Sequence, residues 1–176
     1  MEVEVHWIGE VKAGRLGIMA RPRGGDWLED EIRSLKRSGV DAVISLLERQ
    51  ESEELDIVQE KALCEANEIS FLSYPIRDRD VPSSGEEALK FAQSIVDVLR
   101  NGSNVVIHCR AGIGRSSVIA ACVLVMIGID VDDAFQRIEI ARGCSVPDTR
   151  EQREWVVELA KGEFYCLQRL GNPTSA

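Results

Sequence analysis

One stretch of this chain combines a reactive side chain with groups that bind anions. The apolar segment 105–108 runs into Cys109, a glycine-containing turn follows, and Arg115 opens an apolar stretch with helical character. Backbone N–H groups in such a turn can point inward, and a helix start adds its positive dipole end and unpaired N–H groups. Gly112 and Gly114 permit backbone angles that a side chain forbids. The pattern predicts a ring of inward-pointing N–H groups that binds a tetrahedral dianion, with the Arg115 guanidinium binding two of its oxygens.

The same positive groups act on the cysteine. A thiol at a helix N-terminus beside a guanidinium has a lowered pKa, roughly 3.5–7.5 against about 8.5 for a free thiol. Cys109 is therefore expected to be a nucleophile at neutral pH. An anion-binding loop with a thiolate at its base implies attack on a bound phosphate and a phospho-cysteine intermediate. Ser116 can donate a hydrogen bond to the sulfur, which makes the sulfur a better leaving group in the second step.

The elements that must position these residues alternate between strands and helices. Apolar β-branched runs predict buried strands, and apolar residues at helical spacing predict helices. After strands and turns within Val5–Arg21, the expected strands are Val40–Leu47, Ile69–Ile76 and Asn104–His108. The expected helices are Trp27–Arg37, Glu53–Ala66, a long one after Ser83, Arg115–Met126, Val131–Ala141 and Thr149 to about Gln168. This alternation predicts an α/β fold with a central, mainly parallel sheet flanked by helices.

Two helix starts have capping-box spacing, in which a Ser or Thr is followed three residues later by Glu or Gln. Ser83 with Glu86 precedes a long amphipathic stretch, and Thr149 with Gln152 precedes the last expected helix. A polar loop that includes Asp78 and Asp80 separates the strand Ile69–Ile76 from the helix that follows Ser83.

Length, composition and charge exclude several classes of protein. The chain has 176 residues, of which 44% are apolar and 29% charged. These values are typical of a globular domain, which is expected over residues 1–170 with a flexible tail at residues 171–176. The net charge of −9 argues against binding to nucleic acid or to an anionic membrane, since both need a basic face. An anionic substrate would need a local cluster of positive groups.

The same sequence features also indicate where the protein is located in the cell and whether it binds a metal or a cofactor. No stretch without charges is long enough to span a bilayer, and no secretory signal is visible, so the chain is expected to be cytoplasmic and not inserted in a membrane. Two histidines, and five cysteines without CxxC spacing, make a zinc site unexpected. No metal and no cofactor is predicted.

These residues carry a family resemblance. The run His108-Cys109, five residues, then Arg115-Ser116 resembles the signature of the cysteine-based protein tyrosine phosphatases. The chain length and the segment Tyr74-Pro75-Ile76-Arg77-Asp78 resemble the compact dual-specificity branch, particularly phosphatases similar to cyclin-dependent kinase inhibitor 3, over roughly residues 40–159. The resemblance implies a dual-specificity phosphatase-like fold and phosphorylated protein substrates. The expected targets are phosphotyrosine and also phosphoserine and phosphothreonine.

The resemblance also assigns roles to individual residues. It makes Cys109 the nucleophile and Asp78 the general acid, and it assigns phosphate binding to Arg110, Ala111, Gly112, Ile113, Gly114 and Arg115. Asp80, two residues further along the same loop, is the alternative acid. Gln152 resembles the glutamine that positions the hydrolytic water in some relatives, and it fits the role of a capping-box residue equally well.

Other functions stay open at this point. A phosphoinositide or small-molecule phosphatase is the main alternative, although Ile113 stands where a lysine would favour a highly phosphorylated inositol ring. A rhodanese-type sulfurtransferase also has a cysteine in an anion-binding loop, but it does not explain the helix start at Arg115. A non-catalytic phosphoprotein-binding module does not explain why Cys109, Arg115 and Asp78 are all present. The sequence indicates neither an oligomeric state nor a cysteine that protects Cys109 from oxidation.

Overall fold

The computed structural model describes the backbone of residues 3–170 and the side chains of residues 3–162. Its sheet consists of β1 (His6–Val11), β2 (Gly14–Ala20), β3 (Ala42–Ser45), β4 (Ser70–Ser73) and β5 (Val105–Cys109). The strand order is β1-β2-β5-β3-β4. Strand β1 pairs antiparallel with β2, and the other neighbours pair in parallel. The expected mainly parallel sheet is confirmed.

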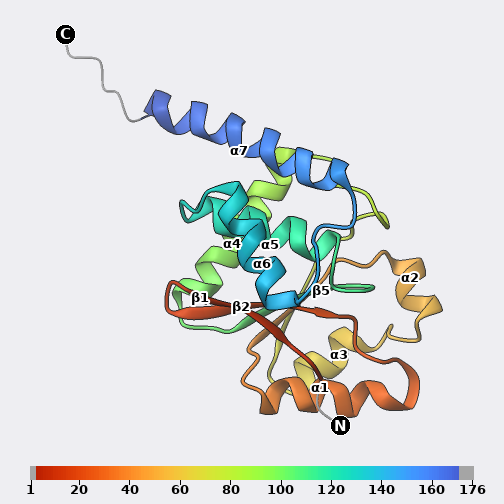
Figure 1. Cartoon of the computed structure of the whole chain (residues 1–176). Coiled ribbons are helices and arrows are strands. Elements are labelled where there is room, and N and C mark those ends of the chain that lie inside the picture. The colour runs from red at the N-terminus through yellow and green to blue at the C-terminus, as the bar shows by residue number, and fades with distance from the viewer. Residues whose placement is uncertain (1–2, 171–176) are drawn as a thin grey trace.

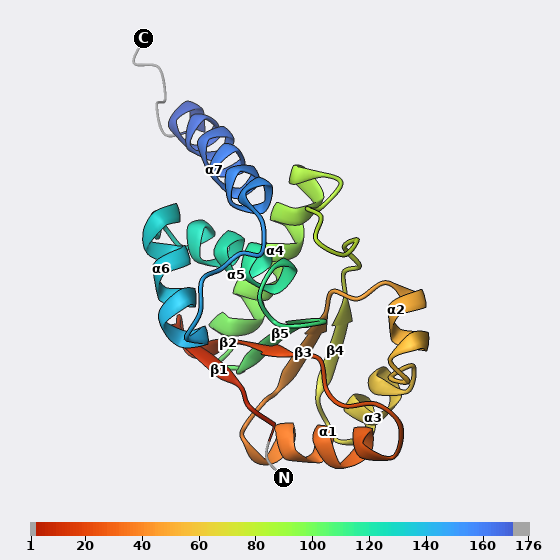
Figure 2. The same ribbon diagram turned by 45° about the vertical axis from the view of Figure 1, so that its right-hand side comes forward.

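Helices cover both faces of this sheet. Within the described residues they are α1 (Leu28–Arg37), α2 (Arg49–Glu54), α3 (Glu60–Ala66), α4 (Gly85–Arg100), α5 (Arg115–Met126), α6 (Val131–Arg142) and α7 (Arg150–Leu170). Helices α4 to α7 lie on one side of the sheet, and α1 and α3 lie on the other (Figure 1). Figure 2 shows the same two layers, with the second half of α7 extending beyond the sheet.

The central strand β5 connects the two layers of the core. All five of its residues are buried. Val105, Ile107 and Cys109 belong to the cluster that includes α4, α5 and α6, whereas Val106 packs with α1 and α3. Because successive side chains in a strand point to opposite faces, this alternation is expected for a strand buried on both sides.

One expected helix is wrong. The apolar spacing predicts a continuous helix over Glu53–Ala66, but the chain forms α2 and α3 with a break between them. At the break, Asp56 has a positive φ of 53°, and its carbonyl accepts a hydrogen bond from the amide of Gly25 at 2.9 Å. The break buries Ile57 and leaves Val58 exposed. A contact with a distant loop therefore overrides the local helical pattern.

The two capping boxes have different outcomes. The cap expected at Ser83 is wrong by one residue, because Ser84 precedes α4 and its hydroxyl accepts from the amide of Glu87 at 3.3 Å. Ser83–Glu86 and Ser84–Glu87 have the same spacing, so the pattern does not separate them. The box of Thr149 and Gln152 is confirmed by two reciprocal hydrogen bonds.

The expected tail at residues 171–176 lies outside the described residues.

None of the helices in the described part of the chain combines the length and the apolar character that crossing a membrane requires.

Candidate active site

The candidate site lies where the central strand meets the start of a buried helix. Cys109 is the last residue of β5, the loop 110–114 follows, and α5 begins at Arg115. Strands β2 and β3 flank β5 in parallel register, so Cys109 is fixed at the carboxyl end of the sheet. This is the edge at which open α/β sheets bind their ligands.

The loop 110–114 is packed tightly against β2. Gly112 has a φ of +67°, and a Cβ built there would lie 2.3 Å from the carbonyl oxygen of Met19. Only glycine fits this position without a shift of the backbone. The amide of Arg21 also donates to the carbonyl of Arg110 at 3.3 Å. The side of the loop that faces the sheet is therefore fixed by backbone contacts.

An arginine from α6 holds the same loop from another direction. Arg142 Nε donates to the carbonyl of Gly112 at 3.1 Å, and its Nη2 donates to the carbonyl of Ala111 at 3.2 Å. In a trans peptide, the carbonyl and the next amide point in opposite directions. The amides of Gly112 and Ile113 therefore point away from Arg142.

Cys109 lies at a small pocket beside this loop. Its side chain is buried, and its Sγ lies 3.4 Å from the hydroxyl oxygen of Ser116. The pocket has a volume of about 200 Å³ and is lined by Asp78, Arg79, Cys109, Arg110, Ala111, Arg115 and Asp148. Three of these residues are arginines. Two others, Asp78 and Asp148, are acidic, so positive side chains still outnumber negative ones at the pocket of this acidic chain.

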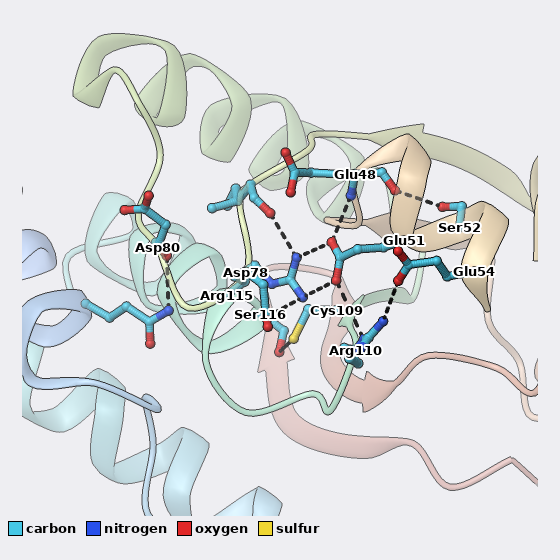
Figure 3. A network of polar contacts seen from close by, with 12 residues as sticks. Glu48, Glu51, Ser52, Glu54, Asp78, Asp80, Cys109, Arg110, Arg115 and Ser116 are labelled. Atoms are coloured by element: carbon cyan, nitrogen blue, oxygen red, sulfur yellow. Dashed lines mark hydrogen bonds and ion pairs between the residues drawn. The ribbon is translucent and has the colours of Figure 1, made fainter.

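Arg115 is held by a carboxylate that sequence reasoning missed. Its guanidinium Nη1 and Nη2 donate to the two carboxylate oxygens of Glu51, in α2, at 2.7 and 2.9 Å (Figure 3). Nη1 also donates to the carbonyl of Ile76 at 2.9 Å. The Arg115 side chain is only 2% exposed. These contacts orient the guanidinium beside Cys109 and satisfy a charge that would otherwise be costly to bury.

The pair of Arg115 and Glu51 shifts both pKa values. Burial alone would raise the pKa of Glu51, but hydrogen bonds from Arg115 and the Glu48 amide, with the charges of Arg115 and Arg110, outweigh it and lower that pKa. Burial alone would lower the pKa of Arg115, but the hydrogen bonds to Glu51 and the charges of Cys109, Glu51 and Asp78 raise it. Both groups are therefore held in their charged forms.

The two candidate acids differ in position. The Asp78 carboxylate lines the pocket, lies 2.9 Å from Nη2 of Arg115 and is 55% exposed. The Asp80 carboxylate instead accepts a hydrogen bond from the amide of Val81 at 2.8 Å. In Figure 3, Asp80 lies on the opposite side of the loop from Cys109. The structure thus brings Asp78, rather than Asp80, to the pocket.

Gln152 is buried and takes part in the capping box, but it does not line the pocket. Asp148, four residues earlier, lines it instead, and sequence reasoning did not single it out. Its carboxylate packs on Gly114, where a Cβ would lie 2.5 Å from Oδ2. No local pattern marks Asp148, which lines the pocket, or Glu51, which holds Arg115, because both act through contacts between segments far apart in the chain.

The neighbouring histidine points to the other face of the sheet. His108 Nε2 lies 2.9 Å from Oε1 of Glu60, in α3, and both side chains are at most 4% exposed. This buried contact ties the strand residue next to Cys109 to α3.

The other cysteines differ in environment. Burial, together with the negative charges of Glu60 and Glu65, raises the pKa of Cys64 to about 12, so its thiol stays protonated at neutral pH. Cys122 is buried in α5 and Cys144 is exposed. The side chain of Cys166 lies outside the described residues.

Similarity to known proteins agrees with this geometry. Rat cyclin-dependent kinase inhibitor 3 is 26% identical over 134 residues, which cover 75% of this chain and 63% of the rat protein. The protein 067L of Invertebrate iridescent virus 3 is 29% identical over 123 residues, 62% of this chain and 50% of the viral protein. The chain thus spans one half to two thirds of these relatives. A crystal structure of kinase associated phosphatase, in which a serine replaces the catalytic site cysteine, has a TM-score of 0.84 at 20% identity and covers 92% of this chain and 96% of that one.

More than half of the chain also matches a known protein family. Residues 17–129 match the Tc-R-P family, described as "Polymorphic toxin system, DSP-PTPase phosphatase". The matched region is well over half of the chain and contains both the 77–83 loop and the segment from Cys109 to Ser116. The chain therefore belongs to this phosphatase family, within the dual-specificity branch of the protein tyrosine phosphatases.

Proposed function

We propose that this chain hydrolyses phosphomonoesters of phosphoproteins through a phospho-cysteine intermediate. One observation carries the proposal: a single pocket of about 200 Å³ is lined by the Cys109 thiol, the Arg115 guanidinium and the Asp78 carboxylate. A nucleophile, an anion-binding group and a proton donor are the three parts that this reaction needs.

In the first step, the Cys109 thiolate attacks phosphorus. The Sγ–P bond forms as the bond from phosphorus to the ester oxygen breaks, and Asp78 gives its proton to the leaving oxygen. Arg115 and the amides of the 110–114 loop bind the equatorial oxygens, on which charge accumulates in the transition state. Glu51 orients the Arg115 guanidinium before substrate binds, and Nη2 exchanges its contact with Asp78, at 2.9 Å, for a phosphate oxygen.

In the second step, water attacks the phospho-cysteine. Asp78 takes a proton from the water, the new O–P bond forms, and the Sγ–P bond breaks to release phosphate. The Ser116 hydroxyl, 3.4 Å from Sγ, stabilises the departing thiolate by donating a hydrogen bond. Asp78 ends the cycle protonated and ready for the next substrate.

The proposed substrates are phosphotyrosine and also phosphoserine and phosphothreonine in proteins. Three arginines at the pocket favour a phosphate dianion, and the low exposure of Cys109 requires the phosphate to reach inward. The names of the relatives, a cyclin-dependent kinase inhibitor and a kinase associated phosphatase, support a phosphoprotein over a small molecule.

The test measures initial rates in EDTA on phosphotyrosine, phosphoserine and phosphothreonine peptides and on phosphoinositides. Cys109→Ser is expected to abolish turnover but to retain phosphate-ester binding, because Arg115 and the loop amides remain. Cys144→Ser, a change at an exposed cysteine, is the matched control and should leave rates unchanged. Turnover that survives Cys109→Ser would exclude the covalent mechanism. Rates confined to phosphoinositides, or thiosulfate–cyanide sulfur transfer alone, would exclude the phosphoprotein assignment.

A further inference from the structure

A buried glutamine joins the 77–83 loop to the start of α7. Gln152 is 0% exposed. Its Nε2 donates to the carbonyl oxygen of Asp80 at 3.0 Å, and its Oε1 accepts from the amide of Thr149 at 3.3 Å. The Thr149 hydroxyl in turn accepts from the amide of Gln152 at 3.2 Å. The capping box therefore fixes the side chain that reaches the loop.

The side chains of the 77–83 loop have two other contacts, since Asp78 pairs with Arg115 at 2.9 Å and Pro82 is buried, but its backbone has little other support. Residues 77–80 are exposed, Arg79 has a positive φ of 59°, and the amide of Asp80 donates to the carbonyl of Arg77 at 3.0 Å. Across the part of the chain that the structure describes, the bond from Gln152 is the one hydrogen bond between the backbone of this loop and another segment. It fixes the turn that carries Asp78.

The geometry favours this role over the positioning of water. Gln152 does not line the pocket, and both the nitrogen and the oxygen of its amide already bond to protein groups. The bonded carbonyl belongs to Asp80, two residues from the Asp78 carboxylate. The hydrogen bond therefore restrains the backbone of the turn on which Asp78 stands.

We propose that Gln152 is a positioning residue that holds the 77–83 loop so that the Asp78 carboxyl stays at the pocket. This inference rests on the proposed phosphatase function. It assigns Gln152 to the first step, in which Asp78 gives its proton to the ester oxygen as the bond from phosphorus to that oxygen breaks. Loss of the hydrogen bond should matter most for leaving groups that need that proton.

Gln152→Glu removes the donor of this hydrogen bond while keeping the length of the side chain. A glutamate of the same length can still accept from the Thr149 amide, but its carboxylate cannot donate to the Asp80 carbonyl. The measurement is kcat/KM against a series of aryl phosphates with increasingly basic leaving groups. We expect a loss of about 10–10²-fold with phenyl phosphate, a loss within about threefold with a dinitrophenyl ester, and a flattened alkaline limb of the pH–rate profile.

Two companion variants define the mechanism. Asp78→Asn should show the same dependence on the leaving group, with a loss of about 10²-fold or more for phenyl phosphate. The double variant should lose less than the product of the two single losses, because both changes act on one proton transfer. Glu151→Gln, an exposed change in the same helical turn, is the control and should leave all rates unchanged.

The outcomes separate this inference from the proposed function. A slowed second step in Gln152→Glu, seen as a burst of phenol with an equal loss for every leaving group, would overturn the inference in favour of a role with water. Unchanged rates in Gln152→Glu, with Asp78→Asn impaired, would overturn the inference and leave the proposed function intact. A wild-type chain without phosphatase activity would overturn both. Rates unaffected by Asp78→Asn would overturn the inference and the role of Asp78 as the acid, while the phospho-cysteine mechanism would stand. Thermal unfolding of each variant shows whether it remains folded.

Discussion

Arg115 is the residue on which the geometry of the site depends most. It is buried between the two oxygens of Glu51 and the Ile76 carbonyl, and its Nη2 also lies 2.9 Å from Asp78. Lysine keeps the positive charge but has no planar pair of donors, so it cannot match two oxygens of a carboxylate and a phosphate together. The same guanidinium therefore serves both folding and anion binding.

Arg115→Lys is expected to lower kcat by about 10²-fold or more, because a preorganised pair of transition-state donors is lost. Steady-state rates with a phosphotyrosine peptide measure the effect. A loss of tenfold or less would mean that the loop amides, and not the guanidinium, stabilise most of the transition-state charge.

Glu51→Gln tests the orientation of that guanidinium separately. The amide cannot accept on both of its atoms, so Arg115 loses one of two fixed contacts, and kcat is expected to fall about 10–10²-fold. Glu53→Gln, an exposed change on the same helix, is the matched control. Equal rates in the two variants would contradict a positioning role for Glu51.

At the scale of elements, the sequence predicted the parallel sheet and the turn between β5 and α5, because both depend on local patterns. β-branched runs mark β3 and β5, and the glycines after Cys109 mark the turn. The break between α2 and α3 was not predictable in this way, since it depends on the contact of Asp56 with Gly25.

The site was predictable to the same extent. Asp78, Cys109 and Arg115 stand in a recognisable spacing, and the structure brings all three to one pocket. Their catalytic roles stay predictions. Glu51 is 64 residues from Arg115 in the chain, and only tertiary packing unites them. No pattern in a single sequence indicates that two residues so far apart in the chain are in contact.

Gly112→Ala tests the close approach of the 110–114 loop to β2. The new Cβ would meet the Met19 carbonyl at 2.3 Å, so the loop must shift and activity should be lost along with stability. Gly102→Ala is the control, because Gly102 also has a positive φ, of +87°, but nothing lies within 4 Å of a Cβ there. That change should cost about 1–2 kcal/mol of stability and leave kcat intact. Similar kcat values in both variants would contradict the role of the close approach.

At the scale of the whole molecule, the pair of Glu51 and Arg115 links stability to pH. The folded-state pKa of Glu51 lies below its ordinary value of 4.5. A depressed carboxyl pKa stabilises the fold above the unfolded-state value, and this contribution is lost as the pH falls through the folded-state value.

The free energy of unfolding of Glu51→Gln should therefore be lower than that of the wild type by about 3 kcal/mol at neutral pH, as for a broken buried ion pair. This difference in the free energy of unfolding between the wild type and Glu51→Gln should become smaller as the pH falls below about 4.5. Urea denaturation of both proteins at a series of pH values measures the difference. Glu86→Gln, which breaks an exposed pair with Lys90, should show almost no difference at any pH. A difference in Glu51→Gln that does not change with pH would contradict the linkage.

The strand order has a consequence for the way the chain folds during synthesis. Strands β2 and β3 are made early, yet they do not pair with each other, because β5 lies between them. The centre of the sheet therefore stays unfilled until residues 105–109 leave the ribosome. The pairings of β5 with β2 and with β3 join segments far apart in the chain, and such contacts carry a high cost in chain entropy. Strand β5 supplies both the centre of the sheet and, as its last residue, Cys109, so a nascent chain that ends before β5 lacks the completed sheet and the nucleophile alike.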